Sequence, residues 1–331
     1  MASAGIMQNI RALLHRALSS EWLVFSLSLA YFLLLYPLIP EIGSIENLGN
    51  IVTGLLPLLV ASIGQTFVLI TAGIDLSITA VIAACSVAGS FVMTADGGLL
   101  ARNPLAAPVA ILAMLALGAI LGLVNGLAIS RLGMPPFMVT LAAMMFVSGS
   151  AVWITGSRNI QNLPPAFTAI TQGSIFTIPY ALLLVLALAL AAHWTLSRSL
   201  IGCWLYAVGH NAKAAGISGV PVGRVVTAAY LASGVCAAVT AILLTARLET
   251  GSPVMGERMI LDIVAAAVLG GSSLFGGKGK VSWTVFGALF ITLVDNSLYL
   301  LGLSYFTILA VKGAIIMAAA ALDAARNRWK N

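Results

Sequence analysis

The chain has 331 residues, of which 60% are hydrophobic and only 8% are charged, and its mean hydropathy is +1.07. Soluble globular domains carry about 25% charged residues, so this chain lacks the polar side chains that a water-facing surface needs. The formal net charge of +6 comes from basic residues scattered between apolar runs, which excludes the basic stripe of a nucleic-acid-binding protein. Composition therefore indicates an integral membrane protein.

The three cysteines and three histidines are too widely separated for a disulfide framework or a metal site. At the N-terminus, Arg11 and Arg16 precede an apolar run from Trp22 to Pro40, which is an arrangement that secretory signal peptides share. This run is about 19 residues long, and no small-x-small cleavage site closes it. We therefore interpret it as a retained first membrane span.

A helix crosses the hydrocarbon core in about 20 residues, and turn residues and charges divide the sequence into segments near that length. The expected spans are 22–40, 50–72, 76–93, 105–130, 136–155, 176–196, 223–246, 261–276, 281–300 and 304–322. The segment 261–276 is short and rich in Ala and Gly, so a re-entrant path is an alternative for it. Lipid offers backbone groups no partners, and no barrel-type alternation is present. We therefore expect an all-α, polytopic protein with about ten transmembrane helices.

Orientation follows from lysine and arginine, which favour cytoplasmic segments. With the N-terminus inside, the outer segments hold only Arg102, Arg158, Arg247 and Arg258, and Lys312 lies within a span. Both termini are therefore expected in the cytoplasm. Residues 1–331 would form a single transmembrane domain whose named cytoplasmic parts are 1–21, 206–220 and 323–331.

A faint internal repeat is also present. GLVNGL at 122–127 is similar to TLVDNSL at 292–298, and at nearly the same offset PFMVTLA at 136–142 is similar to YFTILA at 305–310. Transporters often arise by such duplications. Short Leu/Val matches also arise by chance in so biased a composition, and both explanations stay open.

The segment TAGIDLS at 71–77 joins the second and third spans through a short turn, in which Gly73 can adopt a positive φ. Asp75 stands where the N-cap of the third span is expected, and in one interpretation it only caps that helix. In the other, Asp75 lines a permeation route, because ionisable residues at membrane depth commonly serve function. The route hypothesis groups Asp75 with Ser77, Asn125, Phe137, Thr140 and Asn296.

The longest expected cytoplasmic connection contains YAVGHNAKAAGISGVPVGR at 206–224. Asn211 suits a helix N-cap, and Gly219 with Pro221 ends a short helix over 212–217. Such a helix protruding from the cytoplasmic face suits docking of a soluble partner. An ordinary capped loop is the alternative.

The stretch GGSSLFGGKGK at 270–280 is only superficially similar to a phosphate-binding loop. Ser272 stands where that pattern needs Gly, and Gly279 stands where it needs Ser or Thr. We therefore expect this chain to bind no nucleotide itself. A membrane-embedded serine protease is also disfavoured, because no histidine follows His210 to act as the base.

Four of these segments together resemble the permease subunits of the ribose-type ATP-binding-cassette importers. They are GIDLS (73–77), PFMVTLAAM (136–144), YAVGHNAKAAGISGV (206–220) and LDIVAAAVLGGSSLFGGKGKVSWTVFGALF (261–290). They occur in the family's order. Relatives that carry branched-chain amino acids or nucleosides differ where this chain has GIDLS, so the resemblance implies a sugar. Departures at Ile78-Thr79 and Pro135-Pro136 leave the particular sugar open.

The resemblance implies a transport subunit of the bacterial inner membrane that is not itself an enzyme and holds no cofactor. It would pair with a second copy or a related permease, and two cytoplasmic ATPases holding ATP and Mg would drive alternating access. An extracytoplasmic binding protein would deliver a ribose-like sugar or related polyol. The 206–220 segment would couple to the ATPase through Gly209, Asn211, Ala214, Ala215, Gly216 and Gly219. The alternatives are a non-sugar substrate or a secondary transporter, for which Asp75, Asp295 and Lys312 are the candidate relay groups.

The last two spans are joined by a turn near residue 302, which places Asp295 and Lys312 within about 3 Å of the same depth. An isolated lysine at that depth costs about 2.5 kcal/mol or more on insertion scales. We therefore predict an Asp295–Lys312 ion pair, direct or bridged by water, that braces this hairpin at the outer side. In the alternatives, Lys312 extends to the interface, packs on carbonyl groups near Gly313 or faces the route alone.

Overall fold

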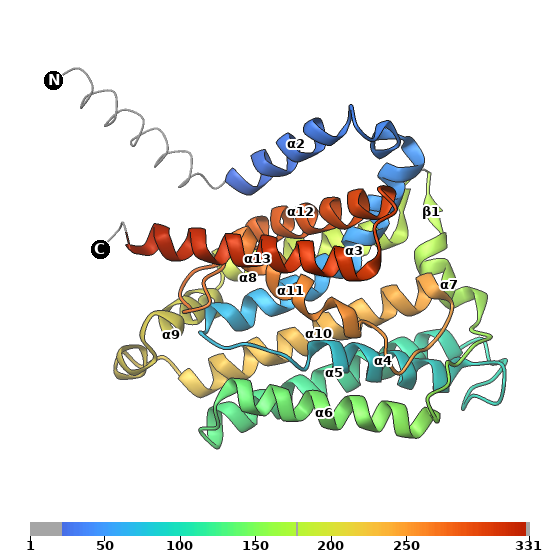
Figure 1. Ribbon diagram of the computed structural model, residues 1–331. Coiled ribbons are helices and arrows are strands. Elements are labelled where there is room, and N and C mark those ends of the chain that lie inside the picture. The colour runs from blue at the N-terminus through green and yellow to red at the C-terminus, as the bar shows by residue number, and fades with distance from the viewer. Residues whose placement is uncertain (1–21, 177, 329–331) are drawn as a thin grey trace. The chain divides into compact units, whose positions relative to one another are not determined.

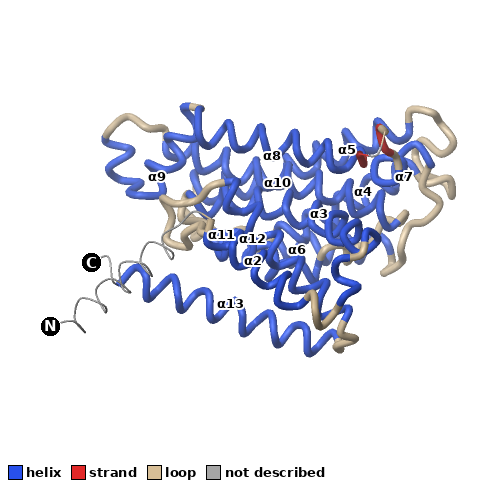
Figure 2. The backbone as a smooth tube through the Cα atoms, turned by 90° about the horizontal axis from the view of Figure 1, so that it is seen from above, coloured by secondary structure: helices blue, strands red, loops and turns tan. Residues whose placement is uncertain are grey.

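The computed structural model describes residues 22–176 and 178–328, and nearly all of them are helical (Figures 1 and 2). The α-helices of this part of the chain are α2 Leu23–Leu35, α3 Ile45–Ile70, α4 Ile78–Met93, α5 Ala106–Arg131, α6 Pro136–Thr155, α7 Pro165–Gln172, α8 Tyr180–Arg198, α9 Leu200–Ile217, α10 Val222–Leu248, α11 Ile260–Gly270, α12 Val281–Leu300 and α13 Tyr305–Arg328. Two 3-10 turns, η1 Pro40–Gly43 and η2 Glu257–Met259, accompany them. Strand β1 Ser174–Ile175 pairs antiparallel with β2 Ile178–Pro179.

The all-helical prediction is confirmed, and every expected span overlaps one of these helices. By length and composition, the helices that could cross a membrane are α3, α5, α6, α8, α10 and α12. Shorter apolar helices are α2, α4 and the first part of α13. The expected cytoplasmic segment 1–21 and the last residues of the tail 323–331 lie outside the described residues.

Three expectations about segment boundaries need correction. The helix expected over 261–276 is α11, which ends at Gly270 because Gly271 adopts a φ of 118° and closes it. Its length of about 16 Å is well short of a hydrocarbon core of about 30 Å. The interval between the expected spans 176–196 and 223–246 is largely helical, as α9, and the interval between 136–155 and 176–196 contains α7.

The chain divides into two compact units. The terminal unit comprises Met1–Ile51 with Leu289–Asn331, and the central unit comprises Val52–Ala288. In the terminal unit, Val294, Leu298 and Ile308 form a buried cluster between α12 and α13. Its partly buried neighbours are Tyr31, Phe290, Val311 and Ile315.

In the central unit, α4 is almost wholly buried and packs against α5, α6 and α10, which lie near it in Figure 1. Helices α5 and α10 approach closely because glycines face each other. A Cβ atom on Gly122 would meet the carbonyl oxygen of Tyr230, and one on Gly118 would meet that of Gly234. Small residues at such contacts let helix backbones pack where hydrophobic driving force between helices is weak.

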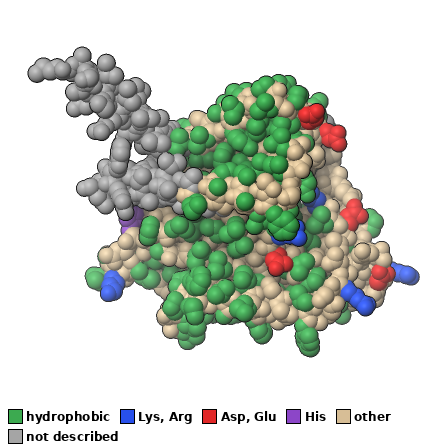
Figure 3. Space-filling model, viewed as in Figure 1, with side chains coloured by type: hydrophobic (Ala, Val, Ile, Leu, Met, Phe, Trp, Pro, Cys, Tyr) green, Lys and Arg blue, Asp and Glu red, His purple; other side chains and the backbone are tan. Residues whose placement is uncertain are grey.

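Other helix faces remain apolar and exposed. On α6, the exposed fractions of Met145, Phe146 and Trp153 are 69%, 76% and 83%, and Figure 3 shows apolar side chains over much of one face. Soluble monomers rarely expose contiguous apolar surface on this scale. These faces therefore suit contact with lipid.

We expect Gly122→Ala to lower the stability of the detergent-solubilised protein by about 1–3 kcal/mol, because the new methyl group overpacks the α5–α10 contact. Gly149→Ala is the matched control, since nothing lies within 4 Å of a Cβ at that position in α6. There alanine's higher helix propensity should leave stability unchanged or raise it by up to about 1 kcal/mol. Thermal unfolding of both variants measures the difference. Equal effects at the two positions would contradict the packing argument.

Candidate functional site

The carboxylate of Asp75 lies at the centre of a buried polar network in the central unit. Asp75 is 2% exposed, and its Oδ1 accepts hydrogen bonds from the Ser77 backbone N–H at 2.9 Å and from the Ser77 hydroxyl at 2.6 Å. The Ser233 hydroxyl of α10 donates to Oδ2 at 2.7 Å. The Asn125 amide of α5 donates to the Ser77 hydroxyl oxygen at 2.8 Å. The segment before α4 is thus tied to two long helices.

The backbone of the same segment is also held by polar side chains. The Tyr230 hydroxyl donates to the carbonyl oxygen of Ile74 at 3.2 Å, and the Thr140 hydroxyl of α6 lies 3.4 Å from that oxygen. With its amide oriented as its neighbours require, Gln65 of α3 donates to the Asp75 carbonyl oxygen at 3.1 Å and accepts from the Asp75 N–H at 3.3 Å. Four helices therefore contribute to one non-helical segment, residues 71–77.

The structure brings together Asp75, Ser77, Asn125 and Thr140 of the predicted route group. The side chains of the other two members are not among those of this network. Phe137 is 51% exposed near the start of α6, and Asn296 belongs to the terminal unit, where its amide exchanges two hydrogen bonds with that of Asn47, at 2.9 and 2.8 Å.

The interpretation of Asp75 as the N-cap of the third span needs correction in position, although its carboxylate does accept a backbone N–H at the start of that helix. Helix α4 begins at Ile78, and its N-cap is Ser77, whose side chain makes no capping hydrogen bond. Asp75 lies two residues earlier and binds the Ser77 N–H instead. Sequence reasoning also missed Gln65, Tyr230 and Ser233, because single polar residues inside apolar helices carry no spacing signal.

The 206–220 segment folds as the predicted capped helix. Helix α9 is interrupted at Asn211, where φ is −160° and ψ is 100°, and the Asn211 Oδ1 accepts from the Ala214 N–H at 3.0 Å. Asn211, Ala214, Gly216 and Gly219 are exposed, whereas Gly209 and Ala215 are buried. The end of this helix, Ile217, is 90% exposed. The segment is thus a firmly capped projection with an apolar end.

A glycine-rich contact supports the base of this projection. A Cβ on Gly209 would meet the carbonyl oxygen of Ile70, the last residue of α3, and the same oxygen accepts from the Gly277 N–H at 2.9 Å. Burial raises the pKa of Tyr206, and its hydroxyl donates to the Gly279 carbonyl oxygen at 2.7 Å. The loop 271–280 thus acts as packing for α9 and the end of α3.

In the terminal unit, the Lys312 Nζ lies 2.6 Å from the Asp295 Oδ1, and the side chains are 15% and 34% exposed, respectively. This distance agrees with the predicted ion pair. Helix α12 ends at Leu300, α13 begins at Tyr305, and Gly302 between them has a φ of 68°. The tight turn puts the two charges on facing helices at a matching level.

If the pair braces this hairpin, the Lys312→Asp variant should fold poorly because it places two carboxylates together. The exchanged double variant, Asp295→Lys with Lys312→Asp, should recover most of the folded amount. Size-exclusion chromatography of the detergent-solubilised proteins measures this recovery. A double variant no better than Lys312→Asp alone would contradict a bracing role.

A pocket of about 410 Å³ opens between the α6–α7 and α10–α11 connections. Its lining is mostly polar: Asn159, Gln161, Asn162, Leu163, Leu248, Glu249 and Thr250. The two connections are joined by the backbone pair Ile160–Gly251, with both N···O distances at 2.8 Å. This backbone pair holds the two connections together beside the pocket. The amide and hydroxyl groups of the lining suit hydroxyl-bearing ligands.

Comparison with known proteins gives a consistent result. The profile of the family described as "Branched-chain amino acid transport system / permease component" matches residues 47–320. The chain is 31% identical to the ribose import permease protein RbsC of Escherichia coli K12 over 93% of this chain and 96% of that protein. It is 38% identical to the Bacillus subtilis RbsC over 78% and 79% of the two chains, respectively. It is 32% identical to the E. coli D-allose transport system permease protein AlsC over 78% of each. No solved structure matches the chain.

Proposed function

The chain belongs to the ATP-binding-cassette permease family whose profile spans residues 47–320, and from this premise we propose that it forms the membrane route of a monosaccharide importer. As a permease component it is a multi-pass inner-membrane protein and the non-catalytic part of its importer, in which a partner ATPase uses the ATP. The observation that carries the sugar assignment is its similarity, along most of its length, to permeases named for ribose and allose.

The proposed substrate is a ribose-like sugar or related polyol, which an extracytoplasmic binding protein delivers. GIDLS at 73–77, where the sugar-type and amino-acid-type permeases differ, supports a sugar over an amino acid. The family's description names branched-chain amino acids, so a non-sugar substrate is the second candidate.

The proposed importer contains two permease subunits, either two copies of this chain or this chain with a related one, and two ATPases. Both termini would face the cytoplasm, which the concentration of lysine and arginine on one set of connections supports. The capped projection at 206–220 would dock on the ATPase, and its exposed apolar end supports this role. Asp75, Ser77, Asn125 and Thr140 would lie beside the route, with Phe137 and Asn296 as further members.

Uptake of labelled compounds tests this function. Cells with the intact gene should take up one or more monosaccharides, and a deletion strain should lose that uptake while keeping leucine uptake. Uptake into inside-out and right-side-out membrane vesicles then shows whether ATP or an ion gradient drives transport. Uptake that follows an ion gradient without ATP would indicate a secondary transporter, and selective loss of leucine uptake would indicate an amino-acid importer.

A further inference from the structure

The connection between α10 and α11 runs into the central unit instead of remaining at the end of α10. The Ser252 N–H donates to the Ser86 hydroxyl at 3.2 Å, and Ser86 shares a 2.7 Å hydrogen bond with Thr245, in the last turn of α10. Four residues further, a Cβ on Gly256 would lie 3.2 Å from Ile82. Since Ile82 precedes Ser86 by one helical turn, the connection descends about 6 Å along α4.

Helix α11 continues in the same direction. A Cβ on Gly287 would meet the Ala266 carbonyl oxygen, and one on Gly270 would meet that of Trp283, so α11 runs antiparallel to the start of α12. The chain after α11 reaches Gly277, beside Ile70 at the end of α3. Helix α3 is antiparallel to α10, because Thr240 approaches Pro57 while Gly64 approaches Ser233. Residues 251–259 therefore lie between the two ends of α10, at membrane depth.

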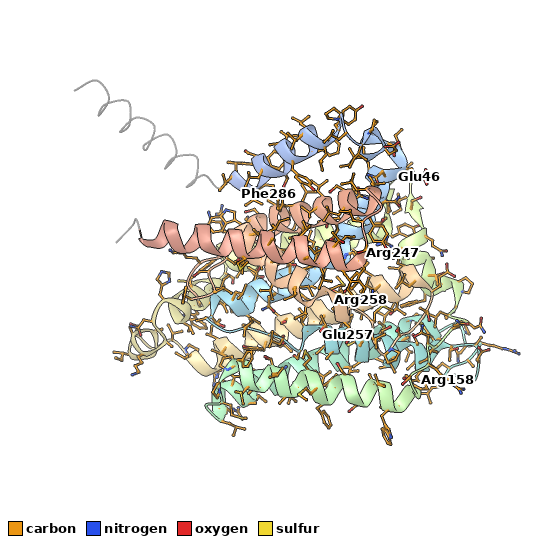
Figure 4. The ribbon with its side chains drawn as sticks, viewed as in Figure 1. Glu46, Arg158, Arg247, Glu257, Arg258 and Phe286 are labelled. Atoms are coloured by element: carbon orange, nitrogen blue, oxygen red, sulfur yellow. The ribbon has the colours of Figure 1, made fainter. Side chains whose placement is uncertain are left out.

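Two charged residues follow this descent with their side chains exposed. Glu257 and Arg258 form most of η2, and both are exposed; Figure 4 labels them on this connection, together with Arg247 of α10. Val254 and Leu261, which are 53% and 57% exposed, lie on either side of them. The exposed surface of this connection thus combines charged and apolar side chains, unlike the apolar surface of α6.

Such a surface is incompatible with contact with lipid tails. Non-helical backbone at membrane depth occurs only where protein covers it or where it borders water. Ionisable side chains at that depth likewise face a bundle interior or a water-filled cavity. The buried side of the connection, including Gly251, Ser252 and Met255, already packs on protein within the chain. The exposed side therefore borders water or a second permease subunit, and the charge of Glu257 and Arg258 favours water.

We propose that residues 254–261 line the aqueous route for the substrate, with Glu257 and Arg258 presenting hydrogen-bonding groups to it. This proposal rests on the proposed function, since it requires a route. A carboxylate accepts hydrogen bonds from neighbouring hydroxyls, and a guanidinium donates to hydroxyl oxygens. Together they suit a neutral, polyhydroxylated solute, which presents donors and acceptors on the same carbon skeleton.

Cysteine labelling in membranes that hold the full importer tests the proposal. The background is Cys203→Ser, because Cys203 is exposed whereas Cys85 and Cys236 are buried. Single cysteines replace Glu257 or Arg258. One control is Asn159→Cys, in the exposed α6–α7 connection, and the other is Met145→Cys, on the apolar face of α6.

Two impermeant thiol reagents are added to either side of the membrane in turn: a small methanethiosulfonate sulfonate and a maleimide on a long polyethylene glycol chain. The small reagent should modify Glu257→Cys and Arg258→Cys at least about tenfold faster than Met145→Cys, because water is absent from the hydrocarbon. The bulky reagent should modify Asn159→Cys and not the two test positions.

Slow labelling of both test positions by the small reagent would overturn the proposal, because lipid or protein would then cover them. Rapid labelling of both by the bulky reagent would also overturn it, because the connection would then lie on the outer surface. Labelling requires no transport. A failure of the sugar assignment, which appears in the uptake assays, is therefore distinguishable from a failure of this inference.

Discussion

Replacing Ile217 by aspartate is expected to reduce uptake to background while the permease still inserts and folds. Ile217 ends the capped projection and is 90% exposed, so the new carboxylate is solvated in the free subunit. Docked on an ATPase, it would be desolvated at a cost of several kcal/mol if unpaired. Uptake and transport-linked ATP hydrolysis should fall together, and co-purification of the ATPase in mild detergent should be lost.

The matched control is Leu99→Asp, which introduces the same charge at a side chain that is 83% exposed in the connection between α4 and α5. This variant should transport normally. Ala215→Asp is a poorer test, because Ala215 is only 6% exposed and a charge there would disturb the projection itself. Wild-type uptake by Ile217→Asp would refute docking at this site.

The helices of this protein could be predicted well from sequence, because membrane spans give a strong signal in composition alone. The boundaries of α5, α6, α10 and α12 follow apolar runs closed by Pro, Gly or charge. The first part of α9 was missed because Gly202, Gly209 and polar residues interrupt its apolar pattern. Its cap at Asn211 was found, since an N-cap residue followed by a Gly and Pro terminator is a local signal.

The buried network was only half predictable, because its partners are set by tertiary packing. Asp75 could be identified because it is an isolated carboxylate in an apolar context, whereas Ser233 is one hydroxyl among several on α10.

The Asp295–Lys312 pair could be predicted from sequence because a tight turn fixes the register of two adjacent helices. The descent of residues 251–259 could not be predicted from sequence, because no local pattern distinguishes a connection that enters the protein from one that stays outside.

Replacing Asp75 by alanine should cause the largest loss of stability among single changes in the network. It removes the acceptor of the Ser77 N–H, the Ser77 hydroxyl and the Ser233 hydroxyl in a fully buried setting. Each buried donor left without a partner costs about 1–3 kcal/mol. We therefore expect detergent stability to fall by at least about 3 kcal/mol, whereas Ser233→Ala, which removes one of the three donors, should cost about 1 kcal/mol.

Asp75→Asn separates the structural role from a role in the route. The amide has the shape of the carboxylate: its oxygen can accept from the Ser77 N–H, and its nitrogen can donate to the Ser233 hydroxyl oxygen, since a hydroxyl both donates and accepts. Stability should therefore remain near that of the unaltered protein. Uptake measured at equal folded amounts then decides, because an uncharged amide preserves the packing but removes the negative charge that substrate hydroxyls would meet. Wild-type uptake by Asp75→Asn would leave Asp75 as a structural tie between residues 71–77 and α10, and impaired uptake with normal stability would place its charge in the transport cycle.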